Sequence, residues 1–409
     1  MTRSAESDIA LAFVGTLVPD CAPFWNEACN RAGNMFQERL LLALSEAGLP
    51  ACLILSQRPM RLFPRSRTLF VRGSRQEVES GLSIELLPYV NLPVIRPLTV
   101  GLIVLSRLVR WKAPPGVKRT VLTYNLTEPP GLFTLIAARL SGASPIASVN
   151  DIFVPGETVA DSWSRRLDFW LQRRLIPRFD GLSVASRRIA EQFAPGIPWV
   201  RNEGGVGDTV VSRFEHHPSV PPSAVGRPFT IAFAGSLTKI NGIPEIVAAF
   251  AQLDGRELRL LVAGRGPEEE VIQRAAAGDA RIDFRGYLSE NEVLELYGEA
   301  DLLLNLRITE RINTDYFFPS KLVEYLATGV PVLSTGTGHV QEEFGEVLFL
   351  LDEESPEALA EALTHLASMD PRARWTRGAA ARKQVLSTHQ WSVQGRKLAA
   401  FIRQIAEQG

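Results

Sequence analysis

Short apolar runs, each ending at a small or cationic residue and followed by a helical stretch, recur through the second half of the chain. Phe229–Phe233, Leu258–Ala263 and Leu302–Leu306 are three of them. Runs of this length are typical of strands that are buried on both faces, and strands that alternate with helices form parallel sheets. The pattern predicts a doubly wound α/β unit, which binds ligands outside the carboxyl ends of its strands.

The remaining elements of this half follow the same alternation. We predict further strands at Arg281–Phe284 and Val330–Ser334 and helices at Pro244–Leu253, Glu290–Tyr297 and Pro319–Ala327. The C-terminal stretch from Pro356 to Gly409 is predicted to be helical throughout.

The first half has a similar but fainter pattern. Strands are predicted at Ile9–Val14, Ala51–Leu55, Thr120–Tyr124, Pro145–Val149 and Gly181–Val184, and a helix at Met35–Ala47. The two halves together predict an α/β protein with two Rossmann-like parallel-sheet domains, as a length of 409 residues also favours.

A proline-rich segment, PSVPPSAVGRP at residues 218–228, separates the halves, because four prolines in eleven residues propagate neither a helix nor a central strand. We therefore predict an N-terminal domain at 1–217, a linker at 218–228 and a second domain at 229–385. A final helix at 386–409 is expected to pack back on the N-terminal domain.

Charge is unevenly distributed between the halves. Residues 1–220 contain 25 Lys and Arg against 19 Asp and Glu, although the whole chain has a net charge of −1. A basic first half is suited to a phosphate-bearing acceptor or an anionic membrane. The alternative is that an excess of six positive charges over this length has no functional meaning. The chain has neither strong overall basicity nor a recognised nucleic-acid-binding motif, so nucleic acid is not an expected partner.

The sequence also bears on the compartment. Three cysteines (Cys21, Cys29 and Cys52) without metal-ligand spacing favour a reducing environment. The acidic start at Met1–Asp8 does not resemble a secretory signal, and the apolar stretch Leu98–Leu105 is too short to span a bilayer. We expect a cytoplasmic protein, soluble or peripheral at the inner face of the membrane.

The segment Trp163–Phe179 (WSRRLDFWLQRRLIPRF) interleaves arginines with aromatic and aliphatic residues. Such a segment is suited to lie on an anionic membrane surface. The alternative, which the sequence favours slightly, is a helix of the first domain with its apolar face in the core and its arginines in water.

The segment FFPSKLVEY (residues 317–325) predicts a phosphate site. Pro319 suits a helix start, where free backbone N–H groups and the positive end of the helix dipole attract anions. Ser320 adds a hydroxyl and Lys321 a cation. Glu324, one turn later on the same face, is placed to accept hydrogen bonds from the hydroxyls of a ribose. The alternative is a capped amphipathic helix with a surface Glu and Lys.

Three other loops are expected to converge on this helix start. Gly235-Ser236 with Lys239 follows one strand, Gly264-Arg265-Gly266-Pro267 follows the next, and Arg307 follows a third. A glycine allows close approach of a backbone, and a cation neutralises a diphosphate. Each loop alone also fits an ordinary turn, and a single Gly-x-Gly is a weak signal.

The run FFPSKLVEYLATGVPVLS resembles the donor-binding motif of family 4 glycosyltransferases, which are retaining enzymes of the GT-B fold. The likeness extends across 229–351 and includes the AGRGP loop and the stretch FRGYLSENEVLELYGEADLLLNL. The resemblance implies two Rossmann-like domains that face each other across a cleft. It implies that the N-terminal domain at 1–217 is the acceptor side and that the domain at 229–385 binds a nucleotide-sugar donor.

The resemblance also assigns residues. Glu324 matches the second glutamate of the family's E-x7-E element, which binds the ribose, and Gly15 matches the glycine of the first N-terminal loop. Asn150-Asp151 falls where relatives place a histidine near the reacting centre. The implied catalytic residues are Lys321, Arg307 and Asp151, and the implied nucleotide-sugar-binding residues are Gly15, Gly235, Ser236, Lys239, Arg265, Gly266, Tyr287, Ser320, Lys321 and Glu324.

The chain departs from the family's pattern at the first glutamate, whose position is taken by Tyr316, with Asp315 beside it. Ser236 and Asn241 stand where many relatives carry Arg and Lys. Lys239, Arg307 and Lys321 are the candidates to supply that charge.

No Asp-x-Asp pair occurs in the sequence, so we expect neither a metal nor any other cofactor. The expected activity is that of a hexosyltransferase that retains the anomeric configuration and transfers to a saccharide or lipid-linked acceptor in polysaccharide or glycoconjugate assembly. Two alternatives share the architecture, a nucleotide-sugar 2-epimerase and a non-catalytic nucleotide-sugar-binding protein.

Overall fold

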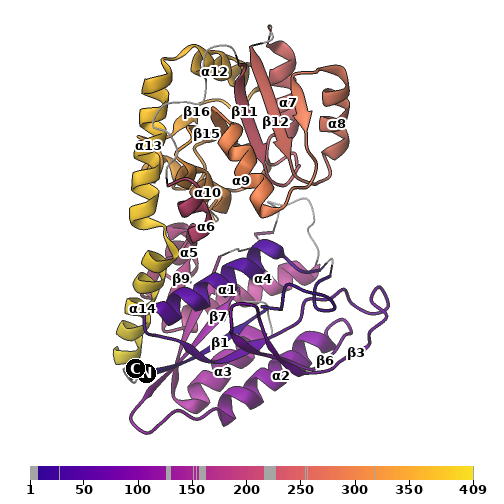
Figure 1. Ribbon diagram of the computed structural model, residues 1–409. Coiled ribbons are helices and arrows are strands. Elements are labelled where there is room, and N and C mark those ends of the chain that lie inside the picture. The colour runs from indigo at the N-terminus through magenta and orange to yellow at the C-terminus, as the bar shows by residue number, and fades with distance from the viewer. Residues whose placement is uncertain are drawn as a thin grey trace. The chain divides into compact units, whose positions relative to one another are not determined.

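The computed structural model describes residues 8–26, 28–125, 130–150, 152, 154–155, 163–215, 227–253, 255, 257–316 and 318–408. The chain forms two compact units (Figure 1). Met1–Gly204 and Trp391–Gly409 form one, here called the N-terminal unit, and Gly205–Gln390 form the other, the C-terminal unit. The units divide earlier in the chain than the predicted linker at 218–228, most of which lies outside the described residues.

The N-terminal unit is built on an eight-stranded sheet in the order β10-β9-β8-β7-β1-β2-β5-β4. All neighbours pair in parallel except β4 and β5, which are antiparallel. The strands are β1 (Ile9–Gly15), β2 (Ala51–Ser56), β4 (Ser74–Glu77), β5 (Ser83–Leu86), β7 (Lys118–Tyr124), β8 (Ala143–Val149), β9 (Gly181–Val184) and β10 (Trp199–Arg201); β3 (Phe70–Val71) and β6 (Tyr89–Val90) form a separate two-stranded sheet.

Helices cover both faces of this sheet. They are α1 (Arg31–Glu46), α2 (Ile95–Arg110), α3 (Pro130–Ser141), α4 (Trp163–Leu175), a 3-10 turn η1 (Ile176–Arg178), α5 (Arg187–Phe193) and, from the end of the chain, α14 (Trp391–Gln408). Successive strand residues point to opposite faces, so Leu11 packs in one core with α1 and α14, whereas Ala12 packs in another with α2 and α3. Gly395 lets α14 approach α1 closely, because a Cβ there would lie 2.4 Å from the carbonyl oxygen of Ala43.

The C-terminal unit is built on a six-stranded parallel sheet in the order β13-β12-β11-β14-β15-β16. Its strands are β11 (Phe229–Ala234), β12 (Leu258–Ala263), β13 (Ile282–Phe284), β14 (Leu302–Asn305), β15 (Val332–Thr335) and β16 (Phe349–Leu351). Numbered within the unit, this order is 3-2-1-4-5-6, the doubly wound order of nucleotide-binding sheets. The direction of winding reverses between β11 and β14, where such sheets bind their ligands.

The helices of this unit are α6 (Asp208–Arg213), α7 (Ile243–Gln252), α8 (Glu269–Gly278), α9 (Glu290–Glu299), α10 (Ser320–Thr328), α11 (Val340–Phe344), α12 (Pro356–Ser368) and α13 (Pro371–Thr388), with a 3-10 turn η2 (Thr309–Arg311). Side chains of α9, α10 and α13 form a core with one face of the sheet, and side chains of α7, α8 and α12 form a core with the other. The predicted helical stretch at 356–409 is thus three helices, interrupted near Met369 and His389.

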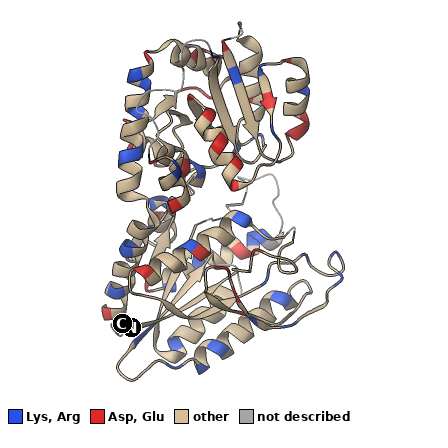
Figure 2. Ribbon diagram, viewed as in Figure 1, with Lys and Arg blue, Asp and Glu red and all other residues tan. Residues whose placement is uncertain are grey.

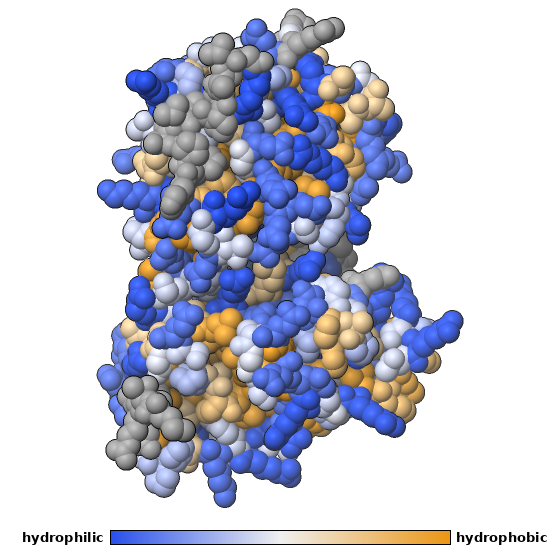
Figure 3. All heavy atoms as spheres, viewed as in Figure 1, coloured by the Kyte–Doolittle hydropathy of each residue, from blue (hydrophilic) through white to orange (hydrophobic). Residues whose placement is uncertain are grey.

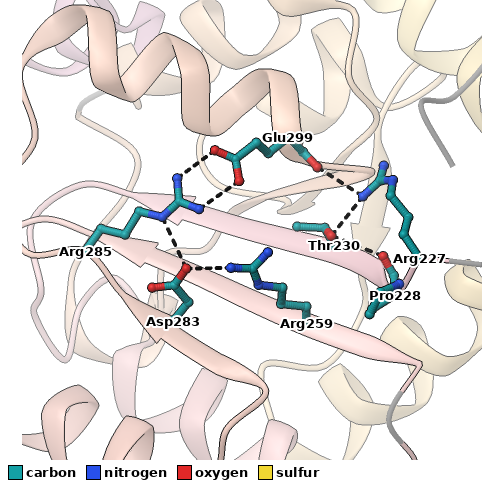
Figure 4. A network of polar contacts seen from close by, with 7 residues as sticks. All are labelled: Arg227, Pro228, Thr230, Arg259, Asp283, Arg285 and Glu299. Atoms are coloured by element: carbon teal, nitrogen blue, oxygen red, sulfur yellow. Dashed lines mark hydrogen bonds and ion pairs between the residues drawn. The ribbon is translucent and has the colours of Figure 1, made fainter.

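A polar network joins the first strands of this sheet to α9 (Figure 4). Arg285 bonds both carboxylate oxygens of Glu299 at 2.7 Å and also contacts Asp283, which accepts a second hydrogen bond from Arg259 at 2.7 Å. The Arg285 guanidinium lowers the pKa of the Glu299 carboxyl. These contacts fix α9 against β12 and β13, and Tyr297 of α9 is important for the site below.

The α/β fold class is confirmed, with one parallel sheet and one sheet that is parallel except for β4 and β5. Gly181–Val184 and Leu258–Ala263 have the predicted limits. For Trp163–Phe179 the sequence slightly favours a helix with its apolar face in the core, and this interpretation is wrong for part of the segment. Trp163, Leu167 and Trp170 of α4 are exposed, with relative accessibilities of 72%, 47% and 47%, although Leu175 and Phe179 are buried. One apolar side of this helix faces solvent and not the core.

Candidate functional site

The carboxyl ends of β11 and β12 form a paired loop that only glycine permits. Gly264 has φ +143°, and a Cβ on it would lie 1.8 Å from the carbonyl oxygen of Gly235. A Cβ on Gly266 would lie 2.2 Å from the carbonyl oxygen of Leu237. The glycines therefore allow the backbones of the two loops to pack against each other at the end of the sheet where a ligand is expected. The side chain of Ser236 in the first loop is exposed.

Arg265 and Tyr287 extend this edge to the end of β13. The Arg265 guanidinium lies 4.7 Å from the centre of the Tyr287 ring, and both side chains are exposed. The N–H of Gly264 donates to the carbonyl of Gly286 at 2.7 Å, which joins the two loops. A cation stacked on an aromatic ring is held in place while its donors stay available to an anion or a base.

Arg307 lies just after β14 and is tied to the loop that follows β11. Its guanidinium donates to Asn241 Oδ1, and Asn241 Nδ2 donates to the carbonyl of Ser236 at 2.6 Å. The backbone N–H of Arg307 donates to Thr335 Oγ1 at 2.9 Å. Burial lowers the pKa of Arg307, yet an arginine remains charged at neutral pH. A fixed, half-buried cation thus lies at the switch point of the sheet.

Helix α10 begins at Ser320, one residue after the predicted start at Pro319. Pro319 precedes the helix without a side-chain capping bond, and Ser320 at the first helical position is exposed. The N–H of Leu322 donates to the carbonyl of Pro319 at 2.9 Å, so the donors left for an anion at this helix start are those of Ser320 and Lys321. The helix ends at Gly329, whose φ of +79° is a left-handed C-cap.

Lys321, Glu324 and Tyr297 form a three-membered polar cluster. The Lys321 ammonium lies 3.1 and 3.2 Å from the carboxylate oxygens of Glu324 and 3.2 Å from the Tyr297 hydroxyl. That hydroxyl lies 3.0 Å from Glu324 Oε1. Burial, and next the Glu324 charge, raise the pKa of Tyr297, so the phenol stays protonated and donates to the carboxylate. Sequence reasoning missed Tyr297, because Glu290–Tyr297 carries a helical pattern that does not show which neighbour the phenol meets.

Tyr325 attaches α10 to the sheet. Its hydroxyl donates to the carbonyl of Ala234 at 2.8 Å and accepts from the N–H of Ala234 at 3.0 Å. The ring also packs edge-on against Tyr297, with the centroids 5.1 Å apart. Burial raises the pKa of Tyr325, whereas the charge of Arg307 acts to lower it. The start of α10, the end of β11 and Arg307 therefore belong to one connected arrangement.

The other predicted residues of this unit are placed less tightly. Lys239 is exposed, and its carbonyl accepts from the Arg311 guanidinium at 2.6 Å. Arg311 in turn pairs with Glu245 at 2.6 Å. Tyr316, at the position of the family's first glutamate, is buried, and Asp315 is exposed. The carboxylate next to the position of the family's first glutamate is therefore that of Asp315, at the surface.

In the N-terminal unit, Gly15 ends β1 beside α1. A Cβ on Gly15 would lie 2.3 Å from Gln37 Oε1, and that oxygen accepts from the N–H of Thr16 at 2.7 Å. Asn34 of the same helix exchanges two hydrogen bonds with the backbone of Val18, at 2.9 and 3.0 Å. The glycine is thus required by the protein's own loop, which α1 fixes at the end of the central strand.

Asn150 and Asn125 mark the carboxyl ends of β8 and β7. The N–H of Asn150 donates to Asn125 Oδ1 at 2.8 Å, and the buried Asn150 Oδ1 accepts no hydrogen bond from the residues that the structure describes. Asp151, which was expected to be catalytic, lies outside the described residues. Two asparagine amides are therefore among the polar groups at the ends of β7 and β8.

The site in the C-terminal unit combines three features of a nucleoside-diphosphate site. Open N–H groups at the start of α10 and the cations Arg307 and Lys321 suit a diphosphate, and Glu324 offers acceptors for two vicinal hydroxyls. Arg265 on Tyr287 offers a flat cation at the rim. The chain thus has two α/β units, each built on a parallel or mostly parallel sheet, which is the architecture of the GT-B type.

Solved structures share this fold over almost the whole chain. Sucrose-phosphate synthase from Thermosynechococcus elongatus aligns with a TM-score of 0.69 at 16% identity, over 98% of this chain and 100% of that one. A glycosyltransferase from Rickettsia africae aligns with a TM-score of 0.66 at 15% identity, over 98% of this chain and 100% of that one. HepE from Anabaena, solved with UDP, aligns with a TM-score of 0.65 at 14% identity, over 97% of this chain and 100% of that one. At these identities the likeness concerns the fold.

The family model described as "Glycosyl transferases group 1" matches residues 228–369. The chain is also 27% identical over 203 residues to the putative colanic acid biosynthesis glycosyltransferase WcaL of Salmonella typhimurium. This alignment covers 48% of this chain and 49% of that protein. It is 28% identical over 155 residues to one subunit of human phosphatidylinositol N-acetylglucosaminyltransferase, over 37% of this chain and 29% of that one. The matched segments thus span about half the length of these relatives or less. The resemblance to glycosyltransferases is supported at the level of group 1.

Proposed function

We propose that the chain is a retaining glycosyltransferase that moves a hexose from a nucleotide-diphosphate sugar to a saccharide or lipid-linked acceptor. One observation carries the proposal. Arg307 follows β14, and Tyr325 ties α10, which carries Glu324, to the end of β11. These two strands flank the switch point of a sheet in the 3-2-1-4-5-6 order, inside the segment that matches the group 1 family. A neighbour of the same fold was solved with UDP, which supports UDP-sugars as the first donors to test.

The donor binds with its ribose hydroxyls on Glu324 and its diphosphate at the N-terminus of α10. Tyr297 holds the carboxylate through its phenol, and Lys321 balances its charge at 3.1 Å. Without the ammonium beside it, the carboxylate would repel a nearby diphosphate. In this pairing one helix binds both the ribose and the phosphates.

Transfer with retention replaces one bond to the anomeric carbon by another on the same face of the sugar. The bond from the anomeric carbon to the diphosphate oxygen breaks, the acceptor oxygen bonds that carbon, and the acceptor proton passes to the leaving diphosphate. Arg307, Lys321 and the start of α10 stabilise the charge that develops on the diphosphate. We propose that this set acts without a metal ion.

The relatives support the proposed class of acceptor and the proposed pathway. WcaL is named for colanic acid biosynthesis, and the human relative is named for transfer to phosphatidylinositol. We therefore place the chain in polysaccharide or glycoconjugate assembly, with action at the cytoplasmic side of a membrane as a prediction. Asn125 and Asn150 of the N-terminal unit are candidates to bind acceptor hydroxyls.

A non-catalytic role is the second candidate, because Tyr316 occupies the position of the family's first glutamate and is buried. The experiment is incubation of the purified protein with radiolabelled nucleotide sugars and a membrane lipid extract, with and without EDTA. Label in the lipid or saccharide fraction supports transfer. Label that stays on the nucleotide as an epimer, or donor binding without turnover, contradicts it.

Lys321→Ala is the matched variant in this assay. It should lower turnover by about a hundredfold, since it removes one of the cations that stabilise the leaving group. Its melting temperature should change little, because Lys321 is partly exposed and its ion pair with Glu324 lies at the surface. An unchanged rate would remove Lys321 from the mechanism.

A further inference from the structure

Exposed apolar side chains concentrate on three helices of the N-terminal unit. Among the described residues, fifteen large hydrophobic side chains are exposed, and nine of them lie on α2, α3 and α4. They are Ile95, Leu98, Leu102 and Val109 on α2, Ile136 and Leu140 on α3, and Trp163, Leu167 and Trp170 on α4. Exposed large apolar side chains gathered on a few helices are typical of an interaction site.

On α2 these residues form a single stripe. Steps of three, four and seven residues from Ile95 to Val109 return to the same side of a helix, while Val100, Val104 and Leu108 on the opposite side are buried against the sheet. Leu102 has a relative accessibility of 54%. The stripe faces away from the core, and the helix itself is not long and apolar enough to cross a membrane, as holds for every helix of the described residues.

The stripe on α4 has the same character. Trp163, Leu167, Trp170 and Arg174 follow one another at steps of four, three and four residues, so they share one side of the helix. The Arg174 guanidinium lies 3.8 Å from the centre of the Trp170 ring. An indole beside a guanidinium is an amphipathic pair of the kind that gathers at the boundary between lipid and water.

Helix α3 connects the two stripes. It packs tightly on α2, because a Cβ on Gly101 would lie 2.1 Å from the ring of Phe133, and Figure 1 shows α2 and α3 side by side. With α4 it forms the walls of a groove of about 1170 Å³, which is mostly apolar and includes Ile136, Leu140 and Arg174. Figure 3 shows apolar side chains at the surface over the region of α2 and α3. The three helices, of which α3 packs on α2 and shares the groove with α4, are from here on called the layer.

The same three helices are strongly basic. They contain eight arginines and a single acidic residue, Asp168 on α4. The arginines are Arg96, Arg107 and Arg110 on α2, Arg139 on α3, and Arg165, Arg166, Arg173 and Arg174 on α4. Arg107 pairs with Glu85, and Arg139 pairs with Asp180. Figure 2 shows Lys and Arg but no Asp or Glu on α2 and α3. The charge of the layer complements an anionic surface.

We propose that the layer of α2, α3 and α4 is the surface by which the protein binds to an anionic lipid bilayer. The apolar stripes enter the boundary between headgroups and acyl chains, and the arginines meet the lipid phosphates. A bilayer explains both halves of the pattern, whereas a protein partner would need its own apolar face with acidic residues to match. The inference is independent of the proposed transfer reaction, because it concerns no residue of the donor site.

The test is flotation of the full chain with vesicles of phosphatidylcholine alone or with added phosphatidylglycerol. We expect binding to the anionic vesicles, none to the neutral ones, and loss of binding at high salt. The triple variant Trp163→Ser, Leu167→Ser, Trp170→Ser and the double variant Arg173→Gln, Arg174→Gln should each weaken binding at least about tenfold. Leu98→Ser with Leu102→Ser tests α2 separately.

Controls come from elsewhere in the chain. Phe70→Ser removes an apolar side chain of 68% relative accessibility on β3, and Arg372→Gln with Lys383→Gln removes two exposed cations of α13; both should bind as the wild type does. A thermal melt of each variant verifies folding. Absence of flotation, equal binding to neutral vesicles, or a dimer that the α4 substitutions dissociate would overturn the proposal. Donor binding is measured on the same samples, so the two proposals fail separately.

Discussion

The phenol oxygen of Tyr297 lies 3.0 Å from a carboxylate oxygen of Glu324, and the two residues belong to different helices. Tyr297 is completely buried on α9, and Glu324 lies one turn into α10. The Arg285–Glu299 pair holds the end of α9 against the sheet. The position of the proposed ribose-binding carboxylate thus depends on a residue outside the FFPSKLVEY segment.

The first prediction concerns this contact. Tyr297→Phe keeps the buried ring but removes the donor to Glu324, so affinity for the nucleotide sugar should fall about tenfold, in line with about 1.5 kcal/mol for a hydrogen bond to a charged group. Isothermal titration with UDP and with the UDP-sugar measures it. A dissociation constant equal to that of the wild type would show that the phenol does not position the carboxylate.

Arg307 provides a second prediction, which separates charge from placement. Arg307→Lys keeps a cation but loses the hydrogen bond to Asn241, and Asn241→Ala keeps the arginine but removes its partner. Both should lower kcat, and Arg307→Ala should lower it most, by about a hundredfold or more. Initial rates at saturating donor, with melting curves, provide the measurement. Rates equal to that of the wild type in all three variants would exclude Arg307 from the reaction.

A third prediction uses the paired glycine loops. Gly264→Ala should destabilise the protein by at least about 2 kcal/mol, because the residue has a positive φ and its Cβ would collide with the Gly235 carbonyl. Gly298→Ala is the matched control: it lies inside α9 with open space around a Cβ, so it should be neutral or slightly stabilising. Urea unfolding of both variants checks this, and equal midpoints would contradict it.

The fold was predictable where strands are buried on both faces. Leu258–Ala263 is largely apolar and its limits were predicted, whereas β4 has the sequence SRQE and no apolar pattern to indicate a strand. The positions of Ser320, Lys321 and Glu324 follow from one helix start, so sequence places them together. The contact of Tyr297 with Glu324 joins two helices whose packing is decided by the tertiary fold. The exposure of Trp170 likewise depends on which side of α4 meets the core.

The Arg285–Glu299 pair leads to a prediction on pH. The guanidinium lowers the pKa of Glu299 in the folded protein below its ordinary value of 4.5. The stabilisation is therefore present above pH 4.5 and is lost as pH falls through the lower folded value. Because Glu299 is partly exposed, the effect should stay below about 1 kcal/mol.

Glu299→Gln tests this directly. The variant should be less stable than the wild type at pH 7, and the difference should shrink as the pH is lowered to about 3. Chemical unfolding at several pH values measures it. A difference that is independent of pH would show that the pair does not contribute through ionisation.

The most direct test of the donor site is a thermal-shift measurement on the wild type and on Glu324→Ala, with UDP-, GDP- and ADP-sugars, each with magnesium or EDTA. At about 100 times its dissociation constant, a ligand should add nearly 3 kcal/mol of stability. We predict a clear rise in melting temperature with one nucleotide class, equal with and without metal, and a much smaller rise in Glu324→Ala. No rise with any nucleotide sugar in folded wild-type protein, or an equal rise in the variant, would contradict the proposed site.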